Sequence, residues 1–135
     1  MTREEDALRL LREEGGKRYE HRFVFWSGGK DSTVSLHLCM RAWKDVDWEA
    51  VFVDTGITFP ETVEYVRGLA DEWGIPLIVL RPERDFYDLV RRWGFPSAPS
   101  YLWCRRMLKF EPIKRFYRER PGWKLQAVSY THLTL

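Results

Sequence analysis

The sequence predicts an α/β fold, a three-layer sandwich in which helices cover a mostly parallel, twisted sheet. Two observations predict it. Short apolar runs alternate along the chain with segments whose apolar residues repeat at helical spacing. Strands and helices taken in strict alternation need crossover connections, and such connections join parallel strands. The length of 135 residues is enough for one domain.

The expected elements follow in order. A leading helix over residues 4–14 should end at Gly15-Gly16 and pack beside the sheet. The helix near residue 60 should begin with a Thr58 cap and carry Pro60 in its first turn. Strands are expected at 22–26, 48–54, 75–80 and 123–128, and the other helices at 31–44, 85–93 and 111–120.

The apolar periodicity also assigns core positions. On the helix over 31–44 we expect Val34, Leu38 and Met40 among the apolar positions and Cys39 in the core, with His37 at the surface or in the core rather than in catalysis. Four tryptophans are interpreted as core residues: Trp26, Trp43, Trp73 and Trp93.

Composition argues against several classes of protein. Hydrophobic residues make up 44% of the chain, which argues against disorder. No apolar run approaches the length of a membrane span, and the charged residues 2–6 differ from a signal peptide, so no membrane partner and a cytoplasmic location are expected. The net charge of +2 gives no general case for nucleic-acid binding. Two cysteines, Cys39 and Cys104, are too few for a four-cysteine cluster, so no iron–sulfur cluster is expected.

One loop has the composition of a phosphate-binding site. A buried strand leads through Ser27, Gly28 and Gly29 into a helix that starts with Lys30, Asp31 and Ser32. The two glycines let the backbone approach a ligand closely, and the helix N-terminus points N–H groups and a positive dipole end at the same place. Ser27 and Ser32 add hydroxyl groups and Lys30 adds a cation. The alternative interpretation is an ordinary strand-to-helix turn.

Two features limit what this loop can be. Its spacing differs from the Walker pattern, and the third glycine of a dinucleotide fingerprint is missing. Asp31 is the unexpected member, because a carboxylate repels phosphate. It would either cap backbone N–H groups or hold Mg²⁺ if the ligand is a triphosphate.

The loop resembles the PP-loop of the adenine nucleotide alpha-hydrolase superfamily, whose fold is Rossmann-like. Asp54-Thr55-Gly56 followed by Phe59-Pro60-Glu61-Thr62 resembles a second signature, that of its phosphoadenylyl-sulfate (PAPS) reductase branch. Trp103-Cys104-Arg105-Arg106 with Lys109 and Pro112 resembles a third segment of that branch. The resemblance covers residues 23–128, most of the chain.

The resemblance implies a role for each matched segment. Residues 27–32 would bind the phosphate or phosphosulfate group. Val53, Asp54, Thr55 and Gly56 would lie against the adenosine, although Asp54-Thr55-Gly56 is also a plausible local turn. Phe59, Pro60, Glu61 and Thr62 would shape the pocket wall. Arg105, Arg106 and Lys109 would reach the sulfate or a second phosphate, or form a solvated basic helix face. Cys104 is the one weak candidate for catalysis.

The resemblance implies three functions. A PAPS-reductase-type protein would bind PAPS or adenylyl sulfate (APS) for reduction to sulfite with a thioredoxin- or glutaredoxin-type reductant. An ATP pyrophosphatase or adenylyltransferase would cleave the bond between the α and β phosphates with Mg²⁺; sulfate adenylyltransferase small subunits, flavin-nucleotide synthases and tRNA or DNA sulfur-modification enzymes are of this kind. A non-catalytic nucleotide-binding domain is the third. Oligomerisation with further copies stays open.

The C-terminal part departs from the family. No cysteine follows Cys104, although a reductase needs a thiol near its C-terminus, and the Gly-x-Arg segment after the fourth strand is absent. Residues 128–133 resemble a translated sequencing-library tag, so we expect native sequence to stop near Ala127. The expected organisation is a leading helix at 1–20, a nucleotide-binding domain at 21–128 that is incomplete at its C-terminus, and a non-native tail at 129–135.

Overall fold

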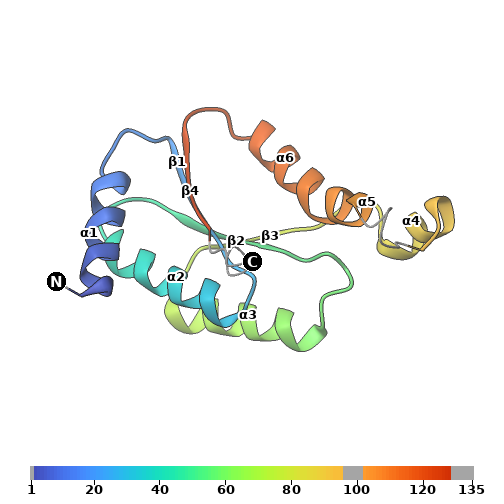
Figure 1. The fold of residues 1–135 in the computed structure, drawn as a ribbon, viewed down its shortest axis with the longest axis horizontal. Coiled ribbons are helices and arrows are strands. Elements are labelled where there is room, and N and C mark those ends of the chain that lie inside the picture. Colours follow the sequence, from blue (N-terminus) through green and yellow to red (C-terminus); the bar gives the residue numbers. More distant parts are fainter. Residues whose placement is uncertain (1, 96–101, 129–135) are drawn as a thin grey trace. The chain divides into compact units, whose positions relative to one another are not determined.

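The computed structural model describes residues 2–95 and 102–128 (Figure 1). The chain divides into two compact units. Unit 1 comprises Met1–Phe52, Tyr65–Ile78 and Gly122–Leu135, and unit 2 comprises Val53–Glu64 and Val79–Pro121. Residues 96–101 and the expected tail at 129–135 lie outside the described residues.

From His21 to Trp93 the strands and helices alternate as the sequence predicts. In chain order they are α1 (Arg3–Gly15), β1 (His21–Phe25), α2 (Lys30–Ala42), β2 (Glu49–Val53), α3 (Pro60–Trp73), β3 (Leu77–Leu80), α4 (Phe86–Trp93), α5 (Leu102–Arg105), a π-helical turn η1 (Arg106–Phe110), α6 (Glu111–Arg118) and β4 (Lys124–Ala127). The four strands form one sheet in the order β3-β2-β1-β4, and β1 runs parallel to both β2 and β4. The predicted α/β class with a mostly parallel sheet is confirmed.

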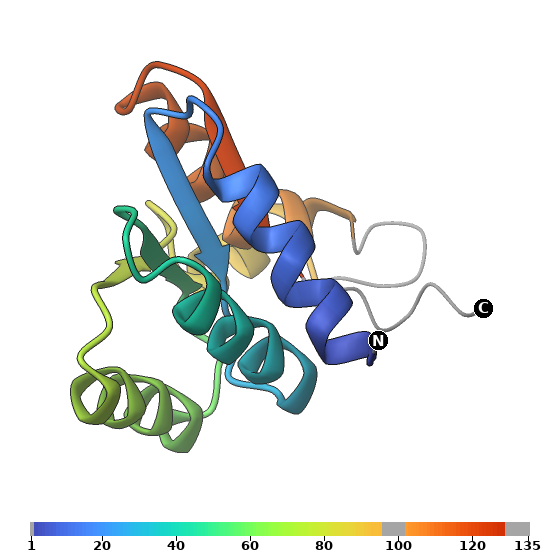
Figure 2. The same cartoon turned by 90° about the vertical axis from the view of Figure 1, so that its left-hand side faces the viewer.

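The middle of the sheet supplies the core of unit 1. Phe23 and Val24 of β1 pair with Glu49 and Ala50 of β2, and β4 runs alongside β1 on its other edge (Figure 2). Phe23, Val24 and Ala50 are fully buried. A strand buried on both faces needs a continuous apolar run, which is why residues 23–25 of β1 and 50–53 of β2 are uninterrupted apolar segments.

Helix α1 packs against α2 within unit 1 (Figure 1). A capping box at Thr2 starts α1, and Gly16 caps its end, as predicted. The indole Nε1 of Trp43, just after α2, donates to the Leu11 carbonyl at 2.7 Å. Gly15 lies so close to this indole that a Cβ built there would be 2.7 Å from Trp43 Cδ1. Trp43 therefore fits only because Gly15 has no side chain.

Three details differ from the sequence-based expectations. Val34 is 56% exposed, because α2 buries Ser32, Leu36 and Cys39 instead. Trp93 is 43% exposed, because it lies in the last turn of α4 with only its edge against Trp103. The helix cap assigned to Thr58 is wrong: α3 begins at Pro60, and the Thr58 hydroxyl bonds to that of Thr55 at 3.1 Å.

Unit 2 has an apolar cluster of its own. Leu89 of α4, Trp103 of α5 and Leu108 of η1 are buried together, with Phe86, Val90, Cys104 and Met107 packed around them. In η1 the hydrogen bonds reach one residue further back than in an α-helix, so Glu111 N donates to the Arg106 carbonyl. Within the described parts of the chain, no helix combines the length and the apolar character needed to cross a bilayer.

Replacing Gly15 by alanine tests the α1–α2 packing. We expect Gly15→Ala to lower the free energy of unfolding by about 1–3 kcal/mol, because the new methyl group overlaps the Trp43 indole. Gly68, inside α3, is the matched control: nothing lies within 4 Å of its Cβ position. Gly68→Ala should raise stability by about 0.5–1 kcal/mol. Urea unfolding of both variants measures the difference, and equal effects would contradict this packing.

Stability should fall at alkaline pH because of Cys39. Burial raises the pKa of this thiol from its ordinary value of 9.0 to about 12. The unfolded chain then loses the proton at a lower pH than the folded chain, so folding is progressively disfavoured as the pH rises from about 9 towards 12. The urea midpoint should therefore fall more between about pH 8 and about pH 10.5 in the wild type than in Cys39→Ala. An equal fall in both proteins would refute the assignment.

Candidate functional site

The predicted phosphate loop lies in unit 1, where β1 gives way to α2. Trp26 directly follows β1, and its backbone N–H donates to the Val51 carbonyl of β2 at 2.9 Å. Gly28 has a φ of +87°, in the left-handed region that residues with side chains rarely adopt. Gly29 then takes an extended conformation and forms the N-cap of α2. Asp31 therefore lies in the first turn of α2 and does not occupy the cap position.

Two serine hydroxyls hold the loop in shape. Ser32 Oγ lies 2.9 Å from Ser27 Oγ and 3.2 Å from both the Ser27 N–H and the Gly29 carbonyl. One arrangement of protons satisfies all three contacts: Ser27 donates to Ser32, and Ser32 donates to Gly29. Ser27 Oγ then accepts the Gly29 N–H at 3.3 Å. In this structure both hydroxyls therefore bond within the loop.

The next residue, Thr33, is one that the sequence analysis missed. Its Oγ1 accepts the indole N–H of Trp26 at 2.9 Å and donates to the Gly29 carbonyl at 2.7 Å. Trp26 is only 2% exposed, so Thr33 satisfies a buried donor. The sequence signal that could have predicted this contact is the pair formed by a Trp before the loop and a Thr after it, seven residues apart.

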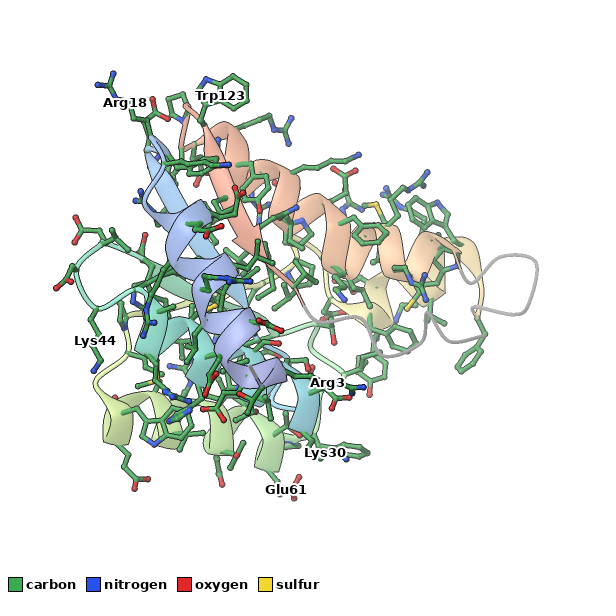
Figure 3. All side chains as sticks on the ribbon, turned by 60° about the vertical axis from the view of Figure 1, so that its left-hand side comes forward. Arg3, Arg18, Lys30, Lys44, Glu61 and Trp123 are labelled. Carbon is green, nitrogen blue, oxygen red and sulfur yellow. The ribbon has the colours of Figure 1, made fainter. Side chains whose placement is uncertain are left out.

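The helix start leaves three backbone donors for a ligand. The first backbone hydrogen bond of α2 runs from Thr33 N to the Gly29 carbonyl at 3.0 Å. The amides of Lys30, Asp31 and Ser32 precede it and have no partner within the helix. The side chain of Lys30 is exposed at this end, whereas Lys44 lies beyond the opposite end (Figure 3). N–H groups, a helix dipole and a cation make this end of α2 suited to an anion.

The second predicted segment begins unit 2, directly after β2. Asp54 is the best-anchored residue of its turn: its N–H donates to the Leu80 carbonyl at 2.8 Å, and its Oδ1 accepts the Gly56 N–H at 3.0 Å. Its Oδ2 lies 3.6 Å from Arg81 Nε. Gly56 has a φ of +87°, which this turn requires. The Asp54 carboxylate therefore stabilises the turn, and Arg81 is a partner that the sequence analysis missed.

The rest of this segment is more accessible. Ile57 and Phe59 are 47% and 76% exposed, Pro60 and Glu61 are exposed, and Thr62 is half-buried. Apolar side chains exposed to this degree are unusual in a packed turn, and they leave an apolar surface at the start of α3 that can contact a ligand.

The third segment lies on the helical stretch from α5 into η1. Trp103 is buried, Cys104 is a half-buried free thiol against the apolar cluster, and Arg105, Arg106 and Lys109 are exposed. Wide turns of this kind are frequent at functional sites. Cys39, by contrast, is fully buried, as predicted. Among the described residues no group of three or more His, Cys, Asp or Glu side chains is arranged to hold a metal ion.

A parallel sheet with a Ser-Gly-Gly loop at a helix start defines an α/β protein of the PP-loop type. Residues 21–126 match the model of the phosphoadenosine phosphosulfate reductase domain. The chain belongs to this family.

Relatives and solved structures agree with this family. An uncharacterized protein of Methanocaldococcus jannaschii is 39% identical over 117 residues, which are 86% of this chain and 24% of that protein. Sulfate adenylyltransferase subunit 2 of Mycolicibacterium gilvum is 33% identical over 84 residues, 61% of this chain and 27% of that protein. The crystal structure of the PAPS reductase of Candida auris, a phosphate complex, has the same fold with a TM-score of 0.64 at 20% identity, covering 93% of this chain and 58% of that one.

The chain is short in comparison with these relatives. It spans about a quarter of the length of its Methanocaldococcus jannaschii and Mycolicibacterium gilvum relatives.

Replacing Thr33 tests the hydrogen bonds that fix the loop. Thr33→Val keeps the shape of the side chain but leaves the buried Trp26 indole N–H without an acceptor, which should cost about 1–3 kcal/mol of unfolding free energy. Thr33→Ser keeps the hydroxyl and should lose less. Urea unfolding followed by tryptophan fluorescence measures both. If Thr33→Val is as stable as the wild type, the Trp26–Thr33 bond does not hold the loop.

Proposed function

We propose that this chain binds an adenine nucleotide through residues 27–32 and is the nucleotide-binding portion of a PAPS-reductase-type protein. The observation that carries the proposal is the start of α2, where three backbone amides without intrahelical partners stand beside the exposed Lys30. A phosphate oxygen can accept these N–H groups without breaking any bond of the loop. Each charge-assisted hydrogen bond contributes about 1.5–3 kcal/mol, so a few of them hold a nucleotide.

The family match suggests roles for the other two segments. Val53, Asp54, Thr55 and Gly56 would contact the adenosine, mostly through backbone groups, because the Asp54 carboxylate already bonds to Gly56 and pairs with Arg81. Phe59, Pro60, Glu61 and Thr62 would provide the wall beside the base. Arg105, Arg106 and Lys109 would bind the sulfate or the second phosphate, for which the forked guanidinium group of arginine is well suited.

In a reductase, PAPS or APS would be reduced to sulfite, with electrons supplied by a thioredoxin- or glutaredoxin-type partner. The thiol that attacks sulfur is the missing part. Cys39 is buried in the core of unit 1, and Cys104 is the remaining cysteine of the sequence. Cys104 is therefore the candidate thiol within this chain, and an attacking thiol supplied from outside it is the alternative.

Adenylyl transfer is the second candidate, and one observation favours it. Several relatives at 33–34% identity are named sulfate adenylyltransferase subunit 2. In this reaction ATP would be cleaved between its α and β phosphates. Mg²⁺, with Asp31 as one ligand, would offset the charge of the phosphates. The third candidate function is that of an accessory domain that binds a nucleotide without catalysis.

Nucleotide titrations of paired lysine variants test the shared part of these proposals. We expect PAPS, APS or ATP to bind the wild-type chain, and Lys30→Ala to weaken the binding about tenfold or more through the loss of one charge-assisted contact. Lys44→Ala removes the same charge beyond the other end of α2 and should bind as the wild type does. Isothermal titration calorimetry measures both, and equal affinities for the two variants would refute the assigned loop.

Measurement of the reaction products distinguishes the three proposed functions. Formation of sulfite from PAPS with a thioredoxin-type reductant supports the reductase, and exchange of labelled pyrophosphate into ATP with sulfate and Mg²⁺ supports adenylyl transfer. Nucleotide binding with neither product supports the accessory role.

A further inference from the structure

The charge of this chain is unevenly distributed, although its total is only +2. Residues 79–121, all within unit 2, contain eleven Lys and Arg against five Asp and Glu, a net charge of +6. The remaining residues carry a net charge of −4. A local excess of this kind is the electrostatic signature of a surface that meets a polyanion, and the total charge conceals it.

Five arginines line two adjoining hollows on unit 2. One hollow is lined by Arg84, Arg115 and Arg118 among others, and it has a volume of about 130 Å³. The second, more open hollow is lined by Arg84, Arg91 and Arg92 together with Asp88. Because Arg84 lines both, the hollows form one surface, which we call the arginine face. It comprises Arg84, Arg91, Arg92, Arg115 and Arg118.

The acidic residues on and near this surface form ion pairs or cap a helix. Glu83 pairs with Arg115 at 2.8 Å, and Asp88 pairs with Arg91 at 2.9 Å. Glu111 lies 3.7 Å from Lys114. Asp85 accepts the Asp88 N–H as the cap of α4.

Three arginines of the face form no ion pair with any described carboxylate. Within the described ranges 2–95 and 102–128, Arg84, Arg92 and Arg118 have no ion-pair partner. Like charges gathered in this way repel one another, and an anion with several charges relieves that repulsion.

Exposed aromatic side chains occur on α4, the helix that also carries Arg91 and Arg92, and directly after it. Tyr87 is 64% exposed and lies one helical turn before Arg91 on α4. Its ring meets Phe86 edge-on with 5.6 Å between centroids, and Phe86 also contacts the 75% exposed Phe95. The partly buried Phe86 therefore supports two rings that face solvent. Exposed rings among arginines suit a strand whose bases stack and whose phosphates pair with guanidinium groups.

We propose that the arginine face of unit 2 binds single-stranded nucleic acid. Arg84, Arg92 and Arg118 contact successive phosphates, and Tyr87 stacks against a base. An acidic polypeptide would also satisfy the arginines but would make no use of the exposed aromatic rings. The proposal is independent of the nucleotide bound by residues 27–32.

Fluorescence anisotropy with a labelled 20-nucleotide single-stranded RNA, its DNA counterpart and polyglutamate tests this surface on the full chain. The triple variant Arg84→Ala/Arg92→Ala/Arg118→Ala should lower the slope of log affinity against log salt by about 2, since each phosphate contact contributes about 0.7. The control Arg3→Ala/Arg18→Ala/Arg67→Ala removes the same charge from exposed sites of unit 1, two of which are labelled in Figure 3, and should leave the slope nearly unchanged.

Two further measurements make the test specific. Tyr87→Ala should weaken the binding of RNA or DNA about fivefold or more and leave polyglutamate binding unchanged, whereas Tyr65→Ala, an exposed tyrosine on α3, should affect neither. Comparison of the affinities for the RNA and DNA oligonucleotides identifies which nucleic acid is preferred. Equal slopes for the two triple variants, tighter binding of polyglutamate, or no binding at low salt would each overturn the proposal. Lys30→Ala should bind the RNA with wild-type affinity. The anisotropy result therefore tests the arginine face alone, whereas the calorimetric titrations test the nucleotide site at residues 27–32.

Discussion

The carbonyl of Gly29 holds the junction between β1 and α2 together. It accepts hydrogen bonds from the backbone N–H of Thr33, from the Thr33 hydroxyl and from the Ser32 hydroxyl. These bonds set the direction in which α2 leaves the sheet, and they leave the amides that precede Thr33 without intrahelical partners. Gly28 makes the junction possible, because only a residue without a Cβ adopts its φ of +87° at little cost. The anion-binding geometry thus follows from the way the chain turns from strand to helix.

Much of the fold could be predicted because the signals are local. β1 and β2 contain apolar runs, and glycine ends or follows the predicted helices at Gly15, Gly74 and Gly94. The strands and the helices α1, α2, α3, α4 and α6 were therefore predicted in the correct order, whereas α5 and η1 were not predicted. The phase of α2 was not predictable in this way. Its buried face is set by Ser32 and Thr33, whose hydroxyls must point back to Gly29, and Val34 is consequently turned to solvent. A polar requirement at one end of the helix decided which apolar residues are buried.

The functional segments show the same limit. The loop at 27–32 could be identified from glycines and hydroxyls in a row, because these residues act where they stand in the sequence. The part played by Arg81 could not, since its contact with Asp54 joins residues that are distant along the chain. The arginine face could not be predicted for another reason. The net charge of the whole sequence combines a basic segment with an acidic remainder, so the two nearly cancel. Charge becomes informative only when the residues that share a surface are known.

The π-helical turn η1 makes this stretch tolerant of one kind of mutation. A π turn accommodates one more residue than the α-helix that would otherwise connect α5 with α6. Removal of a single residue between 106 and 110 would therefore yield a continuous α-helix and need not break it. Because the wide turn takes up the additional residue, its loss would leave the helices on either side in nearly the same relative rotation, and Trp103 would still face Leu89. Differences of one residue in length among family members should therefore be concentrated at this turn, with the basic residues kept on the same face.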